Sequence, residues 1–386
     1  MPESEQQTES LRQRTREICA RFGDEYWRET DKSRRYPEEF VAALVASGLL
    51  TALIPVEYGG MGAGIAQAAA ILEEINRSGG HSAACHAQMY TMGSLLRHGS
   101  EQQKATYLPQ VANGSLRLQA FSITEDAGSD TSSITTTAVA DGDDFLVSGH
   151  KTWTSRIDQS DLMLLLARTA PKGEPRTAGL TLFLVDLRQV RSHQPESVRV
   201  SPVSTMFNYA TNQIDYENLR VPRSAVIGEV GMGFRYVLDS WNAERILLAS
   251  EAIGDGYWFT QRATAYANSR RVFDRLIGEN QGVQFPIAEA YMKVRAADLM
   301  RNRAAELFDE GLPCGAEANM AKYLSSEASW AAANACLDTY GGYGFVTEYD
   351  IERKFRETRM FQIAPVNNNL IRSFVATKVL GLPRSY

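Results

Sequence analysis

The stretch FRYVLDSWNAERILLASEAI, residues 234–253, predicts a long helix that carries a carboxylate on its apolar face. One helical face, with the spacing i, i+4, i+7 and i+11, holds Val237, Trp241, Glu244 and Leu248. Because three of these four residues are apolar, this face should pack against a core or line a cleft. The positions three and four residues from Glu244 hold no cation. We therefore expect a desolvated carboxyl group with a raised pKa, which suits proton abstraction near neutral pH.

This helix alone leaves two interpretations of Glu244 open. In the first, the side chain is a buried general base. In the second, it lies at the edge of the helix and either reaches water or pairs with an arginine from another segment. The choice between them depends on the rest of the chain.

Composition and charge narrow the class of protein. The chain has 386 residues, of which 44% are hydrophobic and 22% charged, enough to build two or three globular domains. Its 40 basic and 46 acidic residues give a net charge of −6 without a long basic run, which argues against a nucleic-acid partner. No stretch is long and apolar enough to span a membrane, and the opening MPESEQQTES lacks the profile of a signal peptide, so we expect a cytoplasmic protein without a membrane partner.

Cysteine and histidine spacing predicts no metal site. The cysteines at positions 19, 85, 314 and 336 form no CxxC pair, so neither a zinc ribbon nor a disulfide scaffold is expected. The histidines at 81, 86 and 98 match no metal-binding spacing, and core or surface roles are the better interpretation.

The spacing of apolar residues changes twice along the sequence. Residues 10–115 show apolar spacing near the helical period, residues 116–228 show short alternating β-branched segments with turns between them, and the helical pattern then returns. The predicted fold class is mostly α with a central β-domain. The expected domains are an N-terminal helical domain (1–115), a middle β-domain (116–228) and a C-terminal helical domain (229–386).

Two segments of the β-domain suggest a ligand site. FSITEDAGSD, residues 121–130, is a turn of small and hydroxyl residues after a strand, with backbone N–H groups that could bind an anion. GHKTWTSR, residues 149–156, offers Trp153 as a flat apolar face, followed by the hydroxyls of Thr154 and Ser155. Each signal is weak alone, because an ordinary strand with a core tryptophan gives the same pattern.

Taken together and in order, these segments resemble the acyl-CoA dehydrogenase family of flavoproteins over nearly the whole chain. The resemblance implies a helical domain, a β-barrel domain and a C-terminal four-helix bundle that bind FAD. TEDAGSD is similar to the family's flavin loop, with one residue fewer, and KTWTS is similar to the segment whose tryptophan lies against the flavin. The implied flavin contacts in this part of the chain are Phe121, Ile123, Thr124, Ser129, Trp153, Thr154 and Ser155.

The C-terminal part carries two further similar segments. YANSRRVFDRLIGENQGVQF resembles the pattern through which one subunit reaches the FAD of its neighbour, and LDTYGGYGF resembles the glycine segment near the pyrophosphate. Two substitutions stand out: Asp274 replaces a glycine, and Asp338 replaces a glutamine that lies near phosphates, which a carboxylate would repel. The implied cofactor contacts here are Arg270, Phe273, Gln281, Asp338, Gly341, Gly342, Asn367 and Asn369.

The position of the catalytic base is the most informative departure. Many members of the family carry it in YEGTNEIQR near the end of the chain, where this sequence reads APVNNNLIR with Pro365 at the position of the glutamate. A minority, the isovaleryl and long-chain types, carry it in a segment similar to WNAERILLA, which contains Glu244. The resemblance therefore favours the base interpretation of Glu244. We further expect Ser129, Asn242 and Arg245 to contact the substrate.

The resemblance implies FAD-dependent α,β-dehydrogenation of an acyl thioester, carried by coenzyme A or by a carrier protein. Glu244 would remove the α-proton while the β-hydrogen leaves as hydride to flavin N5; Pro365, without an N–H, cannot polarise the thioester carbonyl. The expected partners are an electron-transfer flavoprotein or O2 as acceptor, and further copies of the chain in a homotetramer. The alternatives are an acyl thioester oxidase, a flavin monooxygenase of the same fold, and a non-catalytic flavoprotein.

Overall fold

The structure is a computed structural model that describes residues 3–384, and its chain forms two compact units. The first, called the helical unit here, comprises Met1–Arg35, Gly64–Ser82 and Asn242–Tyr386. The second, called the mixed unit, comprises Tyr36–Ala63 and Ala83–Trp241. The predicted order of helices, then strands, then helices is confirmed.

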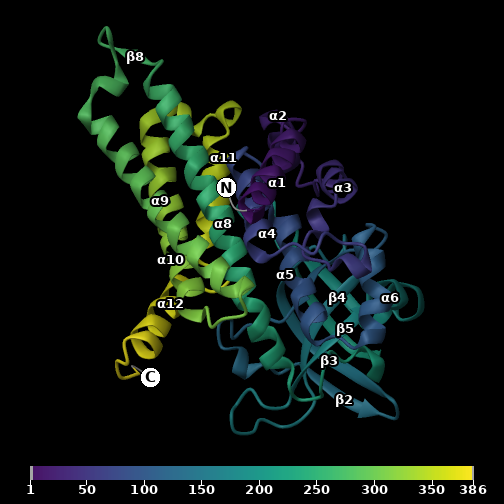
Figure 1. The fold of residues 1–386 in the computed structure, drawn as a ribbon. Coiled ribbons are helices and arrows are strands. Elements are labelled where there is room, and N and C mark those ends of the chain that lie inside the picture. The colour runs from purple at the N-terminus through teal and green to yellow at the C-terminus, as the bar shows by residue number, and fades with distance from the viewer. Residues whose placement is uncertain (1–2, 385–386) are drawn as a thin grey trace. The chain divides into compact units, whose positions relative to one another are not determined.

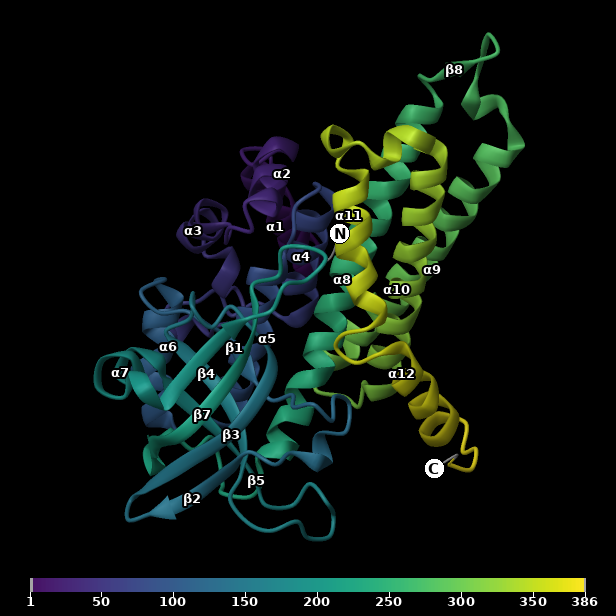
Figure 2. The same ribbon diagram turned by 180° about the vertical axis from the view of Figure 1, so that it is seen from behind.

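The helical unit consists mainly of long helices that lie side by side. In Figures 1 and 2 the helices α8, α9 and α10 run side by side, with α11 along them. The end of α8 connects to α9 through a small hairpin, in which Arg271–Val272 (β8) pairs with Arg275–Leu276 (β9). The helices of this unit are α1 (Glu3–Cys19), α2 (Asp24–Lys32), α4 (Ile65–Arg77), most of α8 (Gly233–Ala267), α9 (Gln281–Asp309), α10 (Gly315–Tyr340), α11 (Ile351–Thr358) and α12 (Asn368–Phe374).

Buried ion pairs join parts of the helical unit that are distant in sequence. Glu73 of α4 accepts hydrogen bonds from Arg12 of α1 (2.9 Å) and from Arg301 of α9 (2.7 Å). Burial alone would raise the pKa of Glu73, but the two guanidinium groups bring it down to about 2. On α11, Arg353 donates to the carbonyl of Gly79 (2.9 Å). These contacts fasten residues 3–35 and 64–82 to the C-terminal helices.

The mixed unit is built around a curled seven-stranded sheet. Its strand order is β1-β4-β2-β3-β7-β6, with β5 paired to β4. The strands are β1 (Leu118–Ser122), β2 (Thr137–Asp141), β3 (Asp144–Ser155), β4 (Leu162–Arg168), β5 (Leu180–Asp186), β6 (Val198–Pro202) and β7 (Thr211–Pro222). The helices of this unit are α3 (Glu38–Ala46), α5 (Ala83–His98), α6 (Glu101–Ala112), α7 (Leu187–His193) and the first turns of α8.

The central strand β4 is buried on both faces. Leu164 packs in one cluster with Met92 of α5 and Leu108 of α6, whereas its neighbour Leu165 packs in a second cluster with Ile214 of β7. Alternate residues of a strand point to opposite faces, so a strand covered on both sides needs a continuous apolar run. The sequence LMLLLA of residues 162–167 meets this need.

Within residues 3–384, no helix has the length and apolar character needed to cross a lipid bilayer. The four cysteines are buried free thiols. Among the same residues, the structure shows no cluster of three or more side chains able to hold a metal ion.

Candidate cofactor and catalytic sites

The turn that follows β1 is held by a buried ion pair. Lys151 of β3 donates one hydrogen bond to Glu125 Oε1 (2.9 Å) and another to the carbonyl of Ile123 (2.9 Å). The Glu125 carboxylate also accepts hydrogen bonds from the backbone N–H groups of Thr135, at Oε2 (2.7 Å), and of Thr136, at Oε1 (3.0 Å). The pair therefore fixes the path of the chain through Ile123 and Thr124.

Both members of this pair are ionised at neutral pH. Burial raises the pKa of Glu125, but Lys151 and the threonine hydrogen bonds reverse this effect and bring the pKa to about 2. Burial lowers the pKa of Lys151 to about 8, against the attraction of Glu125. Neither residue was among the expected site residues. The signal was present, since Glu125 and Lys151 belong to the TEDAGSD and KTWTS segments themselves.

The turn places its expected site residues at different depths. Ile123 is buried, Phe121 and Thr124 are half-buried, and Ser129 is exposed near the tip. Phe121 lies edge-on to Tyr90 of α5, with ring centroids 5.3 Å apart. Gly128 has a φ of 59°, and the turn closes where its N–H donates to the carbonyl of Glu125 (2.8 Å). The tip thus presents Ser129 and backbone groups to the surface of the unit.

Trp153 stands on an irregularity of β3. The register between β3 and β7 shifts between Lys151 and Thr154, and Trp153 has a φ of 61°. A non-glycine residue in the left-handed region at a bulge is a strained feature that is common near functional sites. The bulge turns the indole outwards, so that 57% of Trp153 is exposed. A flat apolar face is therefore available for a planar ring.

The hydroxyl residues after Trp153 lie inside the unit. Thr154 is fully buried, and its hydroxyl donates to Ser122 Oγ (3.1 Å). Ser155 is buried as well and pairs in register with Thr211 of β7. The structure thus separates the exposed Trp153 from the buried Thr154, whose hydroxyl holds β3 to β1.

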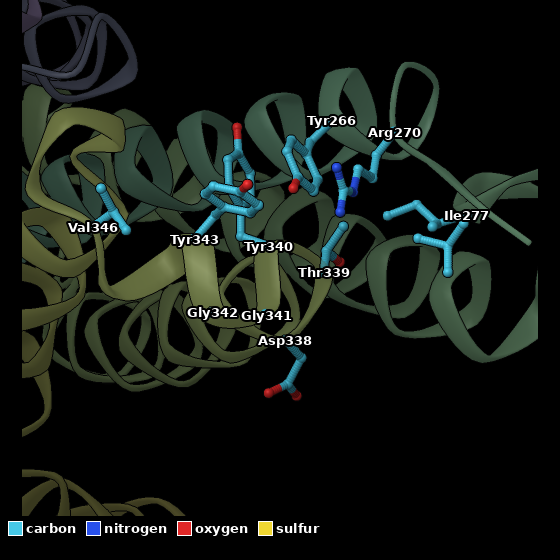
Figure 3. A pocket seen from close by; sticks show the side chains of 11 residues that line it. Tyr266, Arg270, Ile277, Asp338, Thr339, Tyr340, Gly341, Gly342, Tyr343 and Val346 are labelled. Atoms are coloured by element: carbon cyan, nitrogen blue, oxygen red, sulfur yellow. The ribbon is translucent and has the colours of Figure 1, made fainter.

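A pocket of 440 Å³ lies in the helical unit, where α8 and α10 end (Figure 3). Tyr266 and Tyr340 stack there with ring centroids 4.0 Å apart. The Arg270 guanidinium lies 5.6 Å from the ring centroid of Tyr343. Gly341 and Gly342 line the same pocket, and a Cβ at either position would meet only open space.

The residues of this pocket fit a phosphate-containing cofactor. Arg270 supplies a cation, and the two exposed glycines leave backbone groups open to an anion. The Asp338 carboxylate points away from Arg270 and the tyrosines in Figure 3. A phosphate bound beside Arg270 would therefore be repelled less by Asp338 than its position in the sequence suggests.

Phe273 and Gln281 are not among the pocket-lining residues. Phe273 is 95% exposed at the tip of the hairpin, and Gln281 is exposed at the start of α9. Phe273 and Asp274 both have positive φ values, 51° and 62°, in a two-residue turn between paired strands. This is the backbone pattern of a type I′ hairpin turn, which aspartate tolerates, so Asp274 is compatible with the turn.

Glu244 lies on α8 with 4% of its surface exposed, so the burial predicted for it is confirmed. Its neighbour Arg245 bends back along the helix and donates to Asn242 Oδ1 (3.1 Å). Lys322 of α10 is a buried lysine that no sequence pattern singled out. Burial and the charge of Arg245 lower the pKa of Lys322 to about 7, while Glu327 and Glu244 oppose this shift.

The segment around Pro365 packs against α10. Lys322 Nζ donates to the carbonyl of Val366 (2.7 Å) and to Asn368 Oδ1 (3.1 Å). Asn367 caps α12 by accepting from the N–H of Leu370 (3.0 Å). Asn369 is exposed, and its side-chain oxygen accepts from Arg372 (3.4 Å). Both amide oxygens are thus used locally, to start and to support α12.

Comparisons with known proteins cover nearly the whole chain. Family models for the N-terminal, middle and C-terminal domains of acyl-CoA dehydrogenase match residues 5–115, 120–218 and 231–380. The acyl-CoA dehydrogenase fadE12 of Mycobacterium bovis is 34% identical over 100% of this chain and 98% of its own length. A 3-(aryl)acrylate reductase of Clostridium sporogenes is 32% identical over 97% of this chain and 99% of its own length. The structure of a glutaryl-coenzyme A dehydrogenase in complex with glutaryl-CoA superposes with a TM-score of 0.90 at 29% identity, covering 98% of this chain and 96% of that one.

Proposed function

Because this chain belongs to the acyl-CoA dehydrogenase family of FAD-dependent oxidoreductases, we propose that it desaturates an acyl thioester with Glu244 as the base that removes the α-proton. The observation that carries this proposal is the burial of Glu244 on α8, combined with proline at position 365. A buried carboxylate is a stronger base than an exposed one, and proline cannot accept a proton. We further propose that the functional domains are an N-terminal helical domain (1–115), a middle β-domain that binds the flavin and the thioester (116–228), and a C-terminal helical domain that carries the base (229–386).

The chain's own residues would hold FAD at two places. The exposed indole of Trp153 and the turn from Ile123 to Ser129 suit the flavin ring, and the pocket with Arg270 and Gly341 suits the phosphates of the FAD held by a neighbouring copy. Bound FAD supplies the acceptor for the β-hydrogen, which leaves as hydride. Glu244 takes the α-proton, and burial keeps water away from its carboxylate while it does so.

We also propose that the chain works as a homotetramer. Three large apolar side chains on α9 are exposed at a spacing of seven residues: Phe285 (60%), Met292 (62%) and Leu299 (67%). A stripe with this spacing lies along one face of a helix and favours packing against another helix. Phe273, at the tip of the hairpin before α9, is available to a neighbouring copy as well.

The proposal is tested by mixing the purified protein with acyl thioesters in the absence of oxygen. A panel of coenzyme A and carrier-protein thioesters is added, and the absorption of the oxidised flavin is followed. We expect bleaching with at least one thioester. A protein that binds FAD yet is bleached by none of them, although dithionite reduces it, would be a non-catalytic flavoprotein instead.

The electron acceptor needs its own experiment. We propose that the acceptor is an electron-transfer flavoprotein. To test this, the protein is first reduced with a thioester and then exposed either to air or to an electron-transfer flavoprotein. Slow reoxidation by air, together with fast reoxidation by an electron-transfer flavoprotein, supports a dehydrogenase. Fast reoxidation with stoichiometric hydrogen peroxide would make the protein an acyl thioester oxidase, and oxygen incorporation into the product would make it a monooxygenase.

A further inference from the structure

Arg168 is a buried arginine whose guanidinium group joins two loops of the mixed unit. It is the last residue of β4, and 8% of its surface is exposed. In the turn after β1, Nε donates to the carbonyl of Ile134 (3.2 Å) and Nη2 donates to the carbonyl of Ser132 (3.2 Å). In the loop before β5, Nη1 donates to the carbonyl of Ala178 (2.9 Å), and Nη2 also donates to that of Arg176 (3.4 Å). One side chain thus holds the end of the first loop and the end of the second.

The type of acceptor explains why an arginine suits this position. All four acceptors are backbone carbonyls, so the contacts do not depend on the side chains of the two loops. A guanidinium group carries five N–H donors in a fixed planar arrangement, whereas an ammonium group is a compact charge on a flexible stem. The main chain adds a further contact, because the N–H of Arg168 donates to the carbonyl of Thr136 (2.8 Å). Arg168 is therefore suited to bind two loops at once and is itself fixed in the sheet.

The turn after β1 is fastened at its beginning and at its end. At its beginning, Glu125 pairs with Lys151 (2.9 Å), and at its end Arg168 binds the two carbonyls described above. Between these contacts lie residues 126–130, all of them exposed, which include Ser129. Ser129 is the residue of this turn that we expect to contact the thioester. The position of Ser129 therefore depends on both ends of the turn.

The loop before β5 reaches the same part of the turn. Arg176 Nη2 donates to Ser133 Oγ (3.3 Å), and Ser133 Oγ donates to the Asp130 carboxylate (2.5 Å). Both hydrogen bonds are exposed to solvent, so they contribute little by themselves. Arg168 supports them from inside the unit, since it binds the main-chain carbonyl of Arg176. The two loops therefore form one surface beside the exposed residues of the turn.

We propose that Arg168 is a positioning residue for thioester binding: its guanidinium group keeps residues 126–134 and 171–178 together as one wall of the thioester site. The inference rests on the proposed function. A thioester that meets a preformed wall loses less free energy to the ordering of loops when it binds. Without the guanidinium group, the ligand itself would have to order both loops, and its affinity would fall. The chemical step would change little, because Glu125 and Lys151 still hold the beginning of the turn.

The test compares two variants with a matched control. Arg168→Met removes all the donors, and Arg168→Lys keeps the charge but loses the planar arrangement of donors. Arg188→Met is the control, because Arg188 is an exposed arginine of the same unit that pairs with Asp186. Hydrogen–deuterium exchange measures the opening of residues 126–134 and 171–178. Equilibrium dialysis measures binding of the enoyl thioester product, which cannot reduce the flavin, and single-turnover mixing gives the maximal rate of flavin reduction.

In Arg168→Met, we expect both loops to exchange faster and the dissociation constant of the enoyl thioester to rise roughly tenfold. FAD content and the maximal rate of flavin reduction should stay nearly unchanged. Arg168→Lys should change the same quantities in the same direction, so it replaces Arg168→Met if that variant fails to fold. Arg188→Met should behave as the wild type does.

Unchanged exchange of the two loops, or faster exchange without weaker thioester binding, overturns the inference. In either case Arg168 would only stabilise the fold. A wild-type protein that binds no thioester would refute the proposed function itself, and this result is seen without any variant.

Discussion

Pro365 has neither a titratable group nor a backbone N–H, so its position can neither take a proton nor donate a hydrogen bond. Glu244 is the buried carboxylate that can take over the first of these tasks. Glu244→Gln keeps the size and polarity of the side chain but cannot accept the proton. We expect flavin reduction by a good thioester to slow by about 10²–10⁴-fold, with FAD content and thioester binding nearly unchanged.

Pro365→Ala is the matched control for this experiment, and its effect on flavin reduction should be mild. Single-turnover mixing measures both variants directly. In the wild type, the rate should rise with pH through one ionisation, because only the ionised carboxylate can accept the α-proton. A Glu244→Gln protein with the wild-type rate across that pH range would show that the base lies elsewhere.

The pair of Glu125 and Lys151 makes a second prediction at the scale of single residues. Glu125→Gln leaves the buried Lys151 ammonium without its carboxylate, and breaking a buried pair in this way costs roughly 3–5 kcal/mol of unfolding free energy. Urea unfolding at pH 7 measures the loss. Asp126→Asn is the control, because Asp126 is the next residue and is exposed; it should change stability little.

The pH dependence of this loss has a definite sign. The pKa of Glu125 in the folded protein, about 2, lies below its ordinary value of 4.5. Glu125 therefore stabilises the fold above about pH 4.5, and this contribution is lost as the pH falls towards 2. The difference between wild type and Glu125→Gln should shrink over the same window. A difference that is constant from pH 7 to pH 3 would contradict the ionised pair.

Among the structural elements, α9 carries the apolar stripe of Phe285, Met292 and Leu299. Met292→Asp places a charge in the middle of the stripe and should split the tetramer into smaller species, because an unpaired charge in an apolar interface is unfavourable. Light scattering during size-exclusion chromatography measures the assembly. Lys293→Asp, at an exposed position about 100° around the same helix from Met292, should leave the tetramer intact. Equal dissociation of both variants would mean that general charge, and not the stripe, controls assembly.

The end of α8 leads into the pocket and makes the second prediction at this scale. Arg270→Ala removes a charge-assisted hydrogen bond to phosphate, which is worth about 1.5–3 kcal/mol, so the affinity for FAD should fall roughly 10–150-fold. Titration of the apoprotein with FAD, followed by flavin fluorescence, measures the change. Arg271→Ala at the next position is the control. If both variants bind FAD as the wild type does, the cofactor does not use this pocket.

At the scale of the whole molecule, the sequence predicts the order of the elements better than it predicts their packing. The helical spacing of apolar residues predicts that Glu244 lies on an apolar face, and the alternation of apolar and polar residues predicts the strands. Both predictions succeed because each pattern depends only on residues close in sequence. The contact between Glu73 and Arg301 has no such signal, since 228 residues separate the two. The same reason explains why the buried Lys322 was missed: its hydrogen-bond acceptors at Val366 and Asn368 lie 44 and 46 residues away, and periodicity within one helix cannot identify them.

The discontinuity of the helical unit affects the order in which the chain can fold as it is synthesised. The mixed unit, Tyr36–Ala63 and Ala83–Trp241, is complete before the segment Asn242–Tyr386 exists. Ribosomes add about 5–20 residues per second, so roughly 8–32 s pass between the synthesis of Ser82, after α1 and α4, and that of Asn242. During this interval Glu73 has no Arg301 to bind, and the apolar faces of both helices stay open to water or to a chaperone. The helical unit can therefore complete its folding only after its C-terminal segment has been synthesised. Slow elongation would prolong the exposure of its N-terminal helices.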